Sequence, residues 1–347
     1  MQKDFAKSMG NAGQKGGVVK SFILFLAGLL LLAGAALGVG GYLAHKEANA
    51  PGPSDAATVI LLEPGSAVST IADQLHEAGV LKYPDLFTVI VRLKGNQNEM
   101  KAGEYEIPAG ASVIEIIDLL IEGKSILHTI TLPEGLTTAQ MLRIVNAHEI
   151  LEGDLTLEPA EGELLPETYS FTRGETRDEI VREMMKAQDA LIDRLWPDRA
   201  MELPISTAEE AIILASVVEK ETGVPEERPL IAAVFVNRLK RGMRLQSDPT
   251  IIYGLTQGEP LGRGLRQSEL RGETPYNTYV INGLPPTPIA NPGAAAIAAV
   301  LNPAESDYLF FVADGTGGHA FAKTVREHEQ NVANWRRIER ERRQEGG

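Results

Sequence analysis

An uncharged and mostly apolar stretch lies near the start of the chain. Residues 21–44 contain no charged side chain and consist mainly of Leu, Ala, Gly, Val and Phe. A helix of about 24 residues is long enough to cross a hydrocarbon core of about 30 Å. A buried core helix would carry a polar stripe, and a signal peptide would have a shorter apolar region. The pattern predicts a transmembrane helix, while Ala48-Asn49-Ala50 leaves cleavage as a signal peptide open.

The charges before this stretch set its expected orientation. Residues 1–20 contain four lysines and one acidic residue, Asp4. The positive-inside rule therefore predicts that residues 1–20 form a cytoplasmic tail. The chain after residue 44 is then expected on the opposite side of the membrane, beside the lipid.

The next part of the pattern predicts a linker and a small domain. Residues 45–57 are rich in Pro, Ala and small polar residues, as linkers are. Residues 58–125 then read as strand, helix, helix, strand and a further helix. The expected elements are strands at 59–62 and 102–107 and helices at 66–79, 84–94 and 113–122.

The remaining pattern predicts a larger, mixed domain over residues 126–335, so the fold class is α+β. The expected elements are strands at 127–132 and 308–312, helices at 137–147, 177–196, 206–222 and 231–239, and loops or turns at 162–169, 243–250 and 317–321. Residues 336–347 form a tail with a dense run of alternating charges, for which a solvated helix is the simplest interpretation.

Composition removes several classes of function. The 347 residues include 33 basic and 47 acidic side chains, a net charge of −14, which argues against a nucleic-acid partner. There is no cysteine, and the six histidines show no metal-ligand spacing, so we expect no metal and no cofactor. Motifs of serine hydrolases, zinc peptidases and P-loop proteins are absent.

One predicted helix places a carboxylate in an apolar setting. Ser206 and Glu209 have the spacing of a capping box at its start. Residues 211–218 are apolar apart from one serine, which indicates a buried helix. Glu219 follows, and the small side chains one turn earlier would leave a hollow beside its carboxylate.

A carboxyl group in such a setting is suited to acid catalysis. Burial penalises the charged form and raises the pKa, so the group can donate a proton at neutral pH. Two alternatives stay open. Glu219 could instead pair with a nearby Lys or Arg, and Glu221, on roughly the opposite face, is a competing candidate.

Other polar residues stand in loops that could contact a sugar. Tyrosine rings pack against sugar C–H groups, while amides and carboxylates bind hydroxyls. Asp248 is also the best candidate for a second carboxylate, and Arg238 could orient a carboxylate. The candidates for substrate binding are Gln246, Asp248, Tyr276, Asn277 and Arg238.

Five ordered motifs together resemble the endolytic murein transglycosylases, the YceG-like family. The motifs are LASVVEKETG (214–223), NRLKRGMRLQSDPT (237–250), PYNTY (275–279), GLPPTPI (283–289) and FVADGTGGHAF (311–321). The resemblance extends over residues 20 to 335. It implies that the catalytic glutamate is the first Glu of E-K-E, here Glu219, and that the strand–helix–helix–strand unit is LysM-like.

The resemblance also implies a function and a location. The protein would be a single-pass inner-membrane enzyme with a periplasmic catalytic domain that cuts nascent peptidoglycan glycan strands internally. The bond cleaved would be the β-1,4 bond between N-acetylmuramic acid and N-acetylglucosamine, leaving a 1,6-anhydro end and ending strand elongation. Expected partners are glycan strands, the membrane and peptidoglycan synthases such as penicillin-binding proteins.

Two other functions remain as alternatives. A non-catalytic, membrane-tethered LysM-type scaffold would bind the cell wall without turnover. A hydrolase at the same site would instead release reducing-end sugars.

Overall fold

The computed structural model describes residues 13–345 and divides into two compact units, Met1–Ile126 and Leu127–Gly347, each described here by itself. Residues 1–12, the larger part of the predicted cytoplasmic tail, lie outside the described residues. Helix α1 (Gly13–Ala48) contains the predicted span. Within the described residues, Lys20–Ala48 is the one helical stretch apolar and long enough to cross a membrane, with a mean hydropathy of 2.6. It is compatible with a single-pass anchor.

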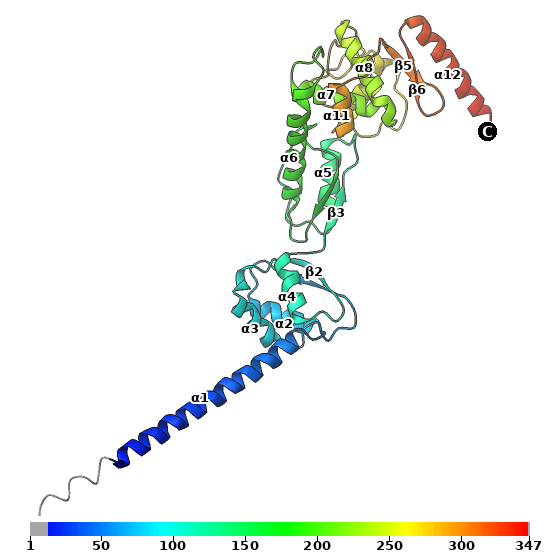
Figure 1. Ribbon diagram of the computed structural model, residues 1–347. Coiled ribbons are helices and arrows are strands. Elements are labelled where there is room, and N and C mark those ends of the chain that lie inside the picture. Colours follow the sequence, from blue (N-terminus) through cyan, green and yellow to red (C-terminus); the bar gives the residue numbers. More distant parts are fainter. Residues whose placement is uncertain (1–12, 346–347) are drawn as a thin grey trace, which may run out of the picture. The chain divides into compact units, whose positions relative to one another are not determined.

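The rest of the first unit is a two-stranded sheet packed against helices (Figure 1). Strands β1 and β2 pair antiparallel, with Thr58 opposite Ile107 and Leu62 opposite Gly103. The sheet and helices bury one apolar core around Phe87 and Tyr105. The elements are β1 (Thr58–Leu62), α2 (Val68–Glu77), α3 (Pro84–Lys94), η1 (Asn96–Asn98), β2 (Gly103–Ile107) and α4 (Val113–Glu122).

The predicted linker at 45–57 is not a free connection. Helix α1 continues to Ala48, which is 2% exposed and belongs to the core of the first unit. Beyond the helix, the Gly52 amide donates to the Gly110 carbonyl at 3.0 Å, and the Gly110 amide donates to Ser54 at 2.8 Å. A Cβ on Gly52 would lie 2.3 Å from the Ala111 carbonyl oxygen, so the backbones meet closely here. Composition cannot show these contacts.

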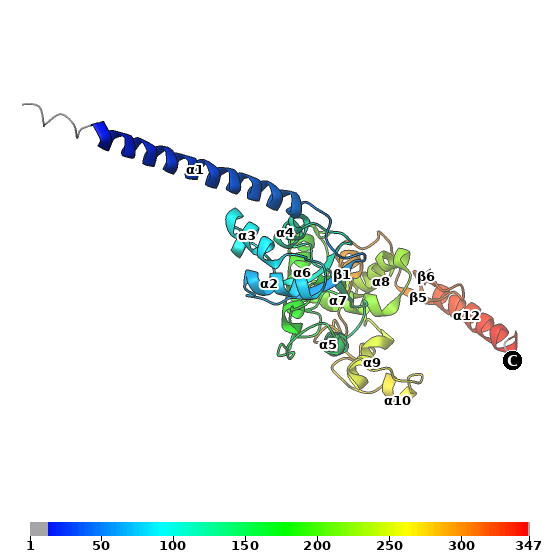
Figure 2. The same ribbon diagram turned by 90° about the horizontal axis from the view of Figure 1, so that it is seen from below.

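The second unit has two antiparallel strand pairs among its helices (Figures 1 and 2). Its elements are β3 (His128–Thr131), α5 (Thr138–Ala147), β4 (Thr168–Phe171), α6 (Arg177–Leu195), η2 (Trp196–Asp198), α7 (Ala208–Glu221), η3 (Pro225–Glu227), α8 (Arg228–Lys240), α9 (Asp248–Thr256), α10 (Gln267–Leu270), α11 (Ala294–Leu301), β5 (Phe310–Ala313), β6 (His319–Ala322) and α12 (Val325–Glu345).

Two apolar clusters organise this unit. One joins the β3–β4 pair to α5 and α6, with Met141, Phe171 and Met184 fully or almost fully buried. The other surrounds α7, which packs against α8 and α11 (Figure 1). Helix α11 is rich in alanine, and these small side chains let it approach α7 closely. This packing therefore fixes the position of the last turn of α7.

Four elements differ from expectation. The predicted loop at 162–169 leads into strand β4, and the predicted turn at 317–321 contains strand β6. The predicted loop at 243–250 ends in α9, with Pro249 at its start, where a missing amide costs nothing. Helix α12 begins at Val325, ahead of the predicted tail, and packs on β5 and β6. Strand β4 pairs with β3, which is distant in the sequence, whereas β6 pairs with the nearby β5.

Candidate active site

Helix α7 ends in the segment Glu219-Lys220-Glu221, which places two carboxylates on different faces. The helix is capped one residue later than expected. Thr207, not Ser206, is the N-cap, and its hydroxyl accepts from the Glu210 amide at 3.2 Å. The Ser206 amide donates back to the Glu210 carboxylate. The apolar residues of α7 are buried, and the two glutamates at its end contact different parts of the chain: Glu219 contacts Gly293, and Glu221 contacts Ser247.

Glu219 lies in an ion-pair cluster and its side chain is only 6% exposed. Its Oε2 accepts from the Gly293 amide at 3.1 Å, and its Oε1 lies 3.5 Å from Arg228 Nη2. Arg228 also contacts Glu134 Oε2 at 3.1 Å. Burial and the nearby Glu134 raise the pKa of Glu219, while the Gly293 amide, Arg228 and Lys220 oppose this. Pairing with an arginine, one of the open alternatives, is therefore present.

The hollow expected beside Glu219 is filled by another part of the chain. The Ser216 hydroxyl, one turn before Glu219, accepts from the Ile289 amide at 3.0 Å. The same segment, continuing to Gly293, supplies the amide that contacts Glu219. Sequence could not show this, because residues 289–293 are brought to α7 only by the fold.

Glu221 sits in a different environment, against the loop that carries the predicted sugar contacts. The Ser247 hydroxyl donates to Glu221 Oε1 at 2.5 Å. Burial raises the pKa of Glu221 to about 7. The charge of Asp248 raises this pKa further, and the Ser247 hydrogen bond, His319 and Arg238 lower it. A carboxyl group with such a pKa holds its proton near neutral pH, as a general acid must.

The loop before α9 is held rigidly against Glu221. Gln246 is exposed and has a left-handed backbone with φ of 52°, which is unusual for a residue with a side chain. Its amide donates to the Thr278 carbonyl at 3.1 Å, and the Ser247 amide donates to the Thr278 hydroxyl at 2.9 Å. Asp248 is exposed and accepts from the Tyr279 hydroxyl at 2.7 Å. Strain maintained by such contacts is typical of functional sites.

The other predicted binding residues have structural contacts. Arg238 is buried and donates to the carbonyls of Leu309 and Leu245 at 2.6 and 2.5 Å. It does not contact Glu219, and its charge instead acts on Glu221. Arg238 therefore holds two backbone segments together behind the site.

Tyr276 and Asn277 belong to the loop that supports the site. The Tyr276 hydroxyl lies 2.8 Å from the Thr287 hydroxyl, and its ring meets Tyr253 edge-on at 5.0 Å. Asn277 is fully buried, and its amide donates to three backbone carbonyls, at Glu269, Leu270 and Gly272. The structure thus brings Ser247 and the charge of Asp248 to Glu221, while Tyr276 and Asn277 shape the surrounding loop.

Sequence reasoning missed three polar residues at this site. Ser247 and Tyr279 stand inside two of the quoted motifs, next to residues that were selected, so those motifs carried the signal. His319 follows two glycines in a third motif, and its Nδ1 lies 2.7 Å from Glu227 Oε2. Among residues 13–345, no group of three His, Cys, Asp or Glu side chains is placed to hold a metal ion.

A cavity lies on the α9 side of the α7 terminus. Its volume is about 380 Å³, and it is lined by Lys220, Pro249, Tyr253 and Ile289 among others. Lys220 is the residue between the two glutamates, and Pro249 follows Asp248. The cavity therefore adjoins the end of α7 and the start of α9, although neither glutamate lines it.

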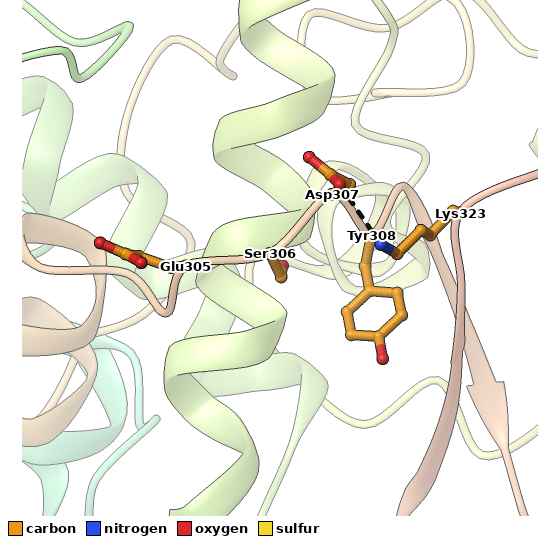
Figure 3. Close-up of a pocket in the computed structure, with 5 residues that line it drawn as sticks. All are labelled: Glu305, Ser306, Asp307, Tyr308 and Lys323. Carbon is orange, nitrogen blue, oxygen red and sulfur yellow. Dashed lines mark hydrogen bonds and ion pairs between the residues drawn. The ribbon is translucent and has the colours of Figure 1, made fainter.

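A separate open pocket of about 370 Å³ lies where the chain enters β5 (Figure 3). Lys323 Nζ lies 3.3 Å from Asp307 Oδ2, and Glu305 points away from this pair. Both partners of the ion pair are mostly exposed, so solvent screens their attraction. The pocket offers no buried acid or base, and the candidate site is at the end of α7.

The fold and site define an α+β protein with a buried acidic group beside a rigid polar loop. The model of the YceG-like family matches residues 60–334, and the chain belongs to this family. The endolytic murein transglycosylase of Streptococcus pneumoniae D39 is 31% identical over 366 residues, covering 91% of this chain. That of Bacillus subtilis is 31% identical over 326 residues, covering 83% of this chain and 88% of the relative.

The chain spans 64% of the length of the pneumococcal relatives it matches. Among solved structures, a YceG-like protein from Listeria monocytogenes is 29% identical, with a TM-score of 0.49. The match covers 80% of this chain and 99% of that one.

Proposed function

We propose that this protein is a membrane-anchored endolytic transglycosylase of peptidoglycan. The observation that carries the proposal is the end of α7, where the carboxyl groups of Glu219 and Glu221 are largely buried and both have a raised pKa. Membership of a family whose relatives are named endolytic murein transglycosylases supports it. The substrate is then a glycan strand, cleaved at the β-1,4 bond between N-acetylmuramic acid and N-acetylglucosamine.

One carboxyl group suffices for this reaction. Protonated Glu219 donates to the glycosidic oxygen, and the bond from that oxygen to C1 of the muramic acid breaks. The Glu219 carboxylate then takes the proton of the muramic C6 hydroxyl as its oxygen bonds to C1. The product is a 1,6-anhydro sugar, no water is consumed, and Glu219 regains its proton. Because the C6 hydroxyl belongs to the same sugar, the attacking group is present at high effective concentration.

We propose Glu219 as the acid, because it is the residue that the family resemblance indicates. Burial and the nearby Glu134 raise its pKa, and its carboxylate is held by Arg228 and the Gly293 amide. Glu221 stays the competing candidate, because its pKa is raised to about 7 and Ser247 donates to it. Gln246 and Asp248, which are exposed, are proposed as sugar contacts.

The remaining roles follow from the contacts already described. Arg238, Tyr276 and Asn277 support the binding loop rather than hydrogen-bond the sugar. The order β1–α2–α3–β2, with its antiparallel sheet, is consistent with a LysM-like unit that grips glycan. Helix α1 would anchor the chain in the inner membrane by a single pass, with both units in the periplasm. There the enzyme would end the elongation of nascent strands, beside synthases such as penicillin-binding proteins.

A matched pair of variants tests the proposal. The full chain in detergent is incubated with purified glycan strands, and products are identified by mass spectrometry. Glu219→Gln is expected to lower the rate of anhydro-product formation by about 100-fold or more, because a general acid contributes about that much. Glu221→Gln is expected to retain most of the rate, since Glu221 transfers no proton in the proposed mechanism.

The products also separate the competing functions. Anhydro ends are lighter than reducing ends by one water, so a hydrolase would be recognised by mass. A scaffold would bind glycan without releasing products. If Glu221→Gln abolishes turnover while Glu219→Gln does not, the assignment of the acid is wrong. If wild type releases no anhydro product, the proposed function is wrong.

A further inference from the structure

The arginine next to Glu219 is shared between two carboxylates. Nη2 of Arg228, the first residue of α8, lies 3.5 Å from Glu219 Oε1 and 3.1 Å from Glu134 Oε2. The shorter contact, to Glu134, is a hydrogen bond. The side chains of Arg228 and Glu219 are only 12% and 6% exposed, whereas that of Glu134 is 41% exposed. The positive charge of Arg228 is therefore divided between the proposed acid and a second carboxylate nearer to solvent.

Glu134 is held in place by the same part of the chain that supports Glu219. The amide of Gly135, the next residue, donates to the Asn291 carbonyl at 3.1 Å. A Cβ on Gly293 would overlap the Glu134 carboxylate, so only glycine leaves room for this carboxylate beside the amide that contacts Glu219. Both carboxylates are therefore braced by the same pair of backbone segments, 134–135 and 291–293.

The contacts of Arg228 differ from those of an arginine that supports the backbone. Arg238 donates to two backbone carbonyls. Arg228 instead donates to Glu134, and its Nε is buried without a hydrogen-bond partner among the residues that the structure describes. A buried donor without a partner costs free energy, so this position does not satisfy the guanidinium best. What the position provides is a positive charge between two carboxylates.

We propose that Glu134 is a positioning residue that keeps the charge of Arg228 beside Glu219 while Glu219 is protonated. The inference rests on the proposed function, in which Glu219 is the acid. Before proton transfer, Glu134 supplies the counter-charge of the buried guanidinium. As the proton leaves, a negative charge forms at Glu219, 3.5 Å from Arg228 Nη2 and bonded to the Gly293 amide. A guanidinium stays charged throughout, so its attraction is stronger in the transition state than in the ground state.

The groups around Glu219 act on its pKa in opposite directions. Burial is the largest cause of the raised pKa, and the charge of Glu134 adds to it. The Gly293 amide, Arg228 from α8 and Lys220 from α7 lower this pKa. Removing the charge of Glu134 is therefore expected to lower the pKa of Glu219, and removing that of Arg228 is expected to raise it.

The test compares pH–rate profiles of the full chain acting on purified glycan strands, with anhydro products measured by mass spectrometry. In Glu134→Gln the alkaline limb of kcat is expected to move to lower pH, because Arg228 then faces Glu219 alone. In Arg228→Gln the limb is expected to move to higher pH, and the plateau to fall by about 10-fold, as when a charged group loses a hydrogen-bonding partner. Arg182→Gln is the matched control, since Arg182 lies 3.6 Å from Asp178 of its own helix, and it should change neither.

Two further variants separate positioning from simple loss of structure. Arg228→Lys keeps the charge and is expected to return the limb and the plateau toward wild type. Glu134→Gln combined with Arg228→Gln removes both opposing charges, so the limb is expected to return while the plateau stays low. Limbs that do not move, or that move in the same direction in both single variants, would overturn the inference. Failure of the proposed function is seen separately, in a wild type that releases no anhydro product or a Glu219→Gln variant that keeps its rate.

Discussion

Replacing Glu221 with glutamine is expected to stabilise the fold at alkaline pH. The wild-type carboxyl has an ordinary pKa of 4.5 when unfolded and a pKa of about 7 when folded. Below pH 4.5 the group is protonated in both states and has no effect on stability. Above pH 7 the folded protein must hold a buried carboxylate. Its free energy of unfolding therefore falls as pH rises from 4.5 to 7.

The size of this fall follows from the two pKa values. A difference of about 2.5 between 4.5 and 7 corresponds to about 3 kcal/mol. Glutamine has no charge to lose, and its side-chain oxygen can still accept from Ser247. At pH 8.5 the variant is expected to be more stable by as much as about 3 kcal/mol. For a unit of this size that amounts to roughly 6–12 °C in Tm.

Calorimetry of the full chain in detergent at pH 4 and pH 8.5 measures the effect. Hydrogen exchange of the α7 amides assigns the transition to the second unit. Glu209→Gln, an exposed glutamate in the first turn of the same helix, is the control and should change little at either pH. Equal stability of wild type and Glu221→Gln at pH 8.5 would refute the reasoning, because it would mean that Glu221 is not held in a desolvated site.

Two further predictions concern the supports of the fold. Asn277→Ala removes an amide that donates to three carbonyls, so the second unit should lose about 2 kcal/mol, measured by its Tm; an unchanged Tm would show that water replaces the amide. Gly52→Ala places a Cβ 2.3 Å from the Ala111 oxygen, which should destabilise the first unit by about 1–3 kcal/mol. Faster hydrogen exchange in β1 and β2 checks this, and unaltered exchange would contradict it.

The predictable part of the fold is the part with local periodicity. Helices α3 and α4 have the predicted bounds, because each has one apolar face and clear end signals. Helix α11 was not predicted, because its sequence AAAIAAVL contains no polar residues whose spacing would indicate a helix. Strands β4 and β6 were missed for another reason. Each is only four residues long, too short to show a clear alternating pattern, and β4 also depends on pairing with the distant β3.

The candidate site shows the same division. The sequence indicated a buried helix with a carboxylate near its end, but not which of the two faces would meet the polar loop. That choice is made by residues 289–293, which cover the Glu219 face, and by Ser247, which covers the other. Glu227 and His319 are 92 positions apart, and only the fold brings them together.

Helix α1 enters the core of the first unit without a break, since Ala48 is buried there and the following residues are bonded to the Gly110 turn. Glu47 also lies 3.5 Å from Lys82, just before α3. In a bilayer, the first unit would therefore follow the tilt of α1 instead of swinging on a tether. Its distance from the lipid surface would then be set by helix geometry, so lengthening α1 by one turn should raise this unit by about 5 Å.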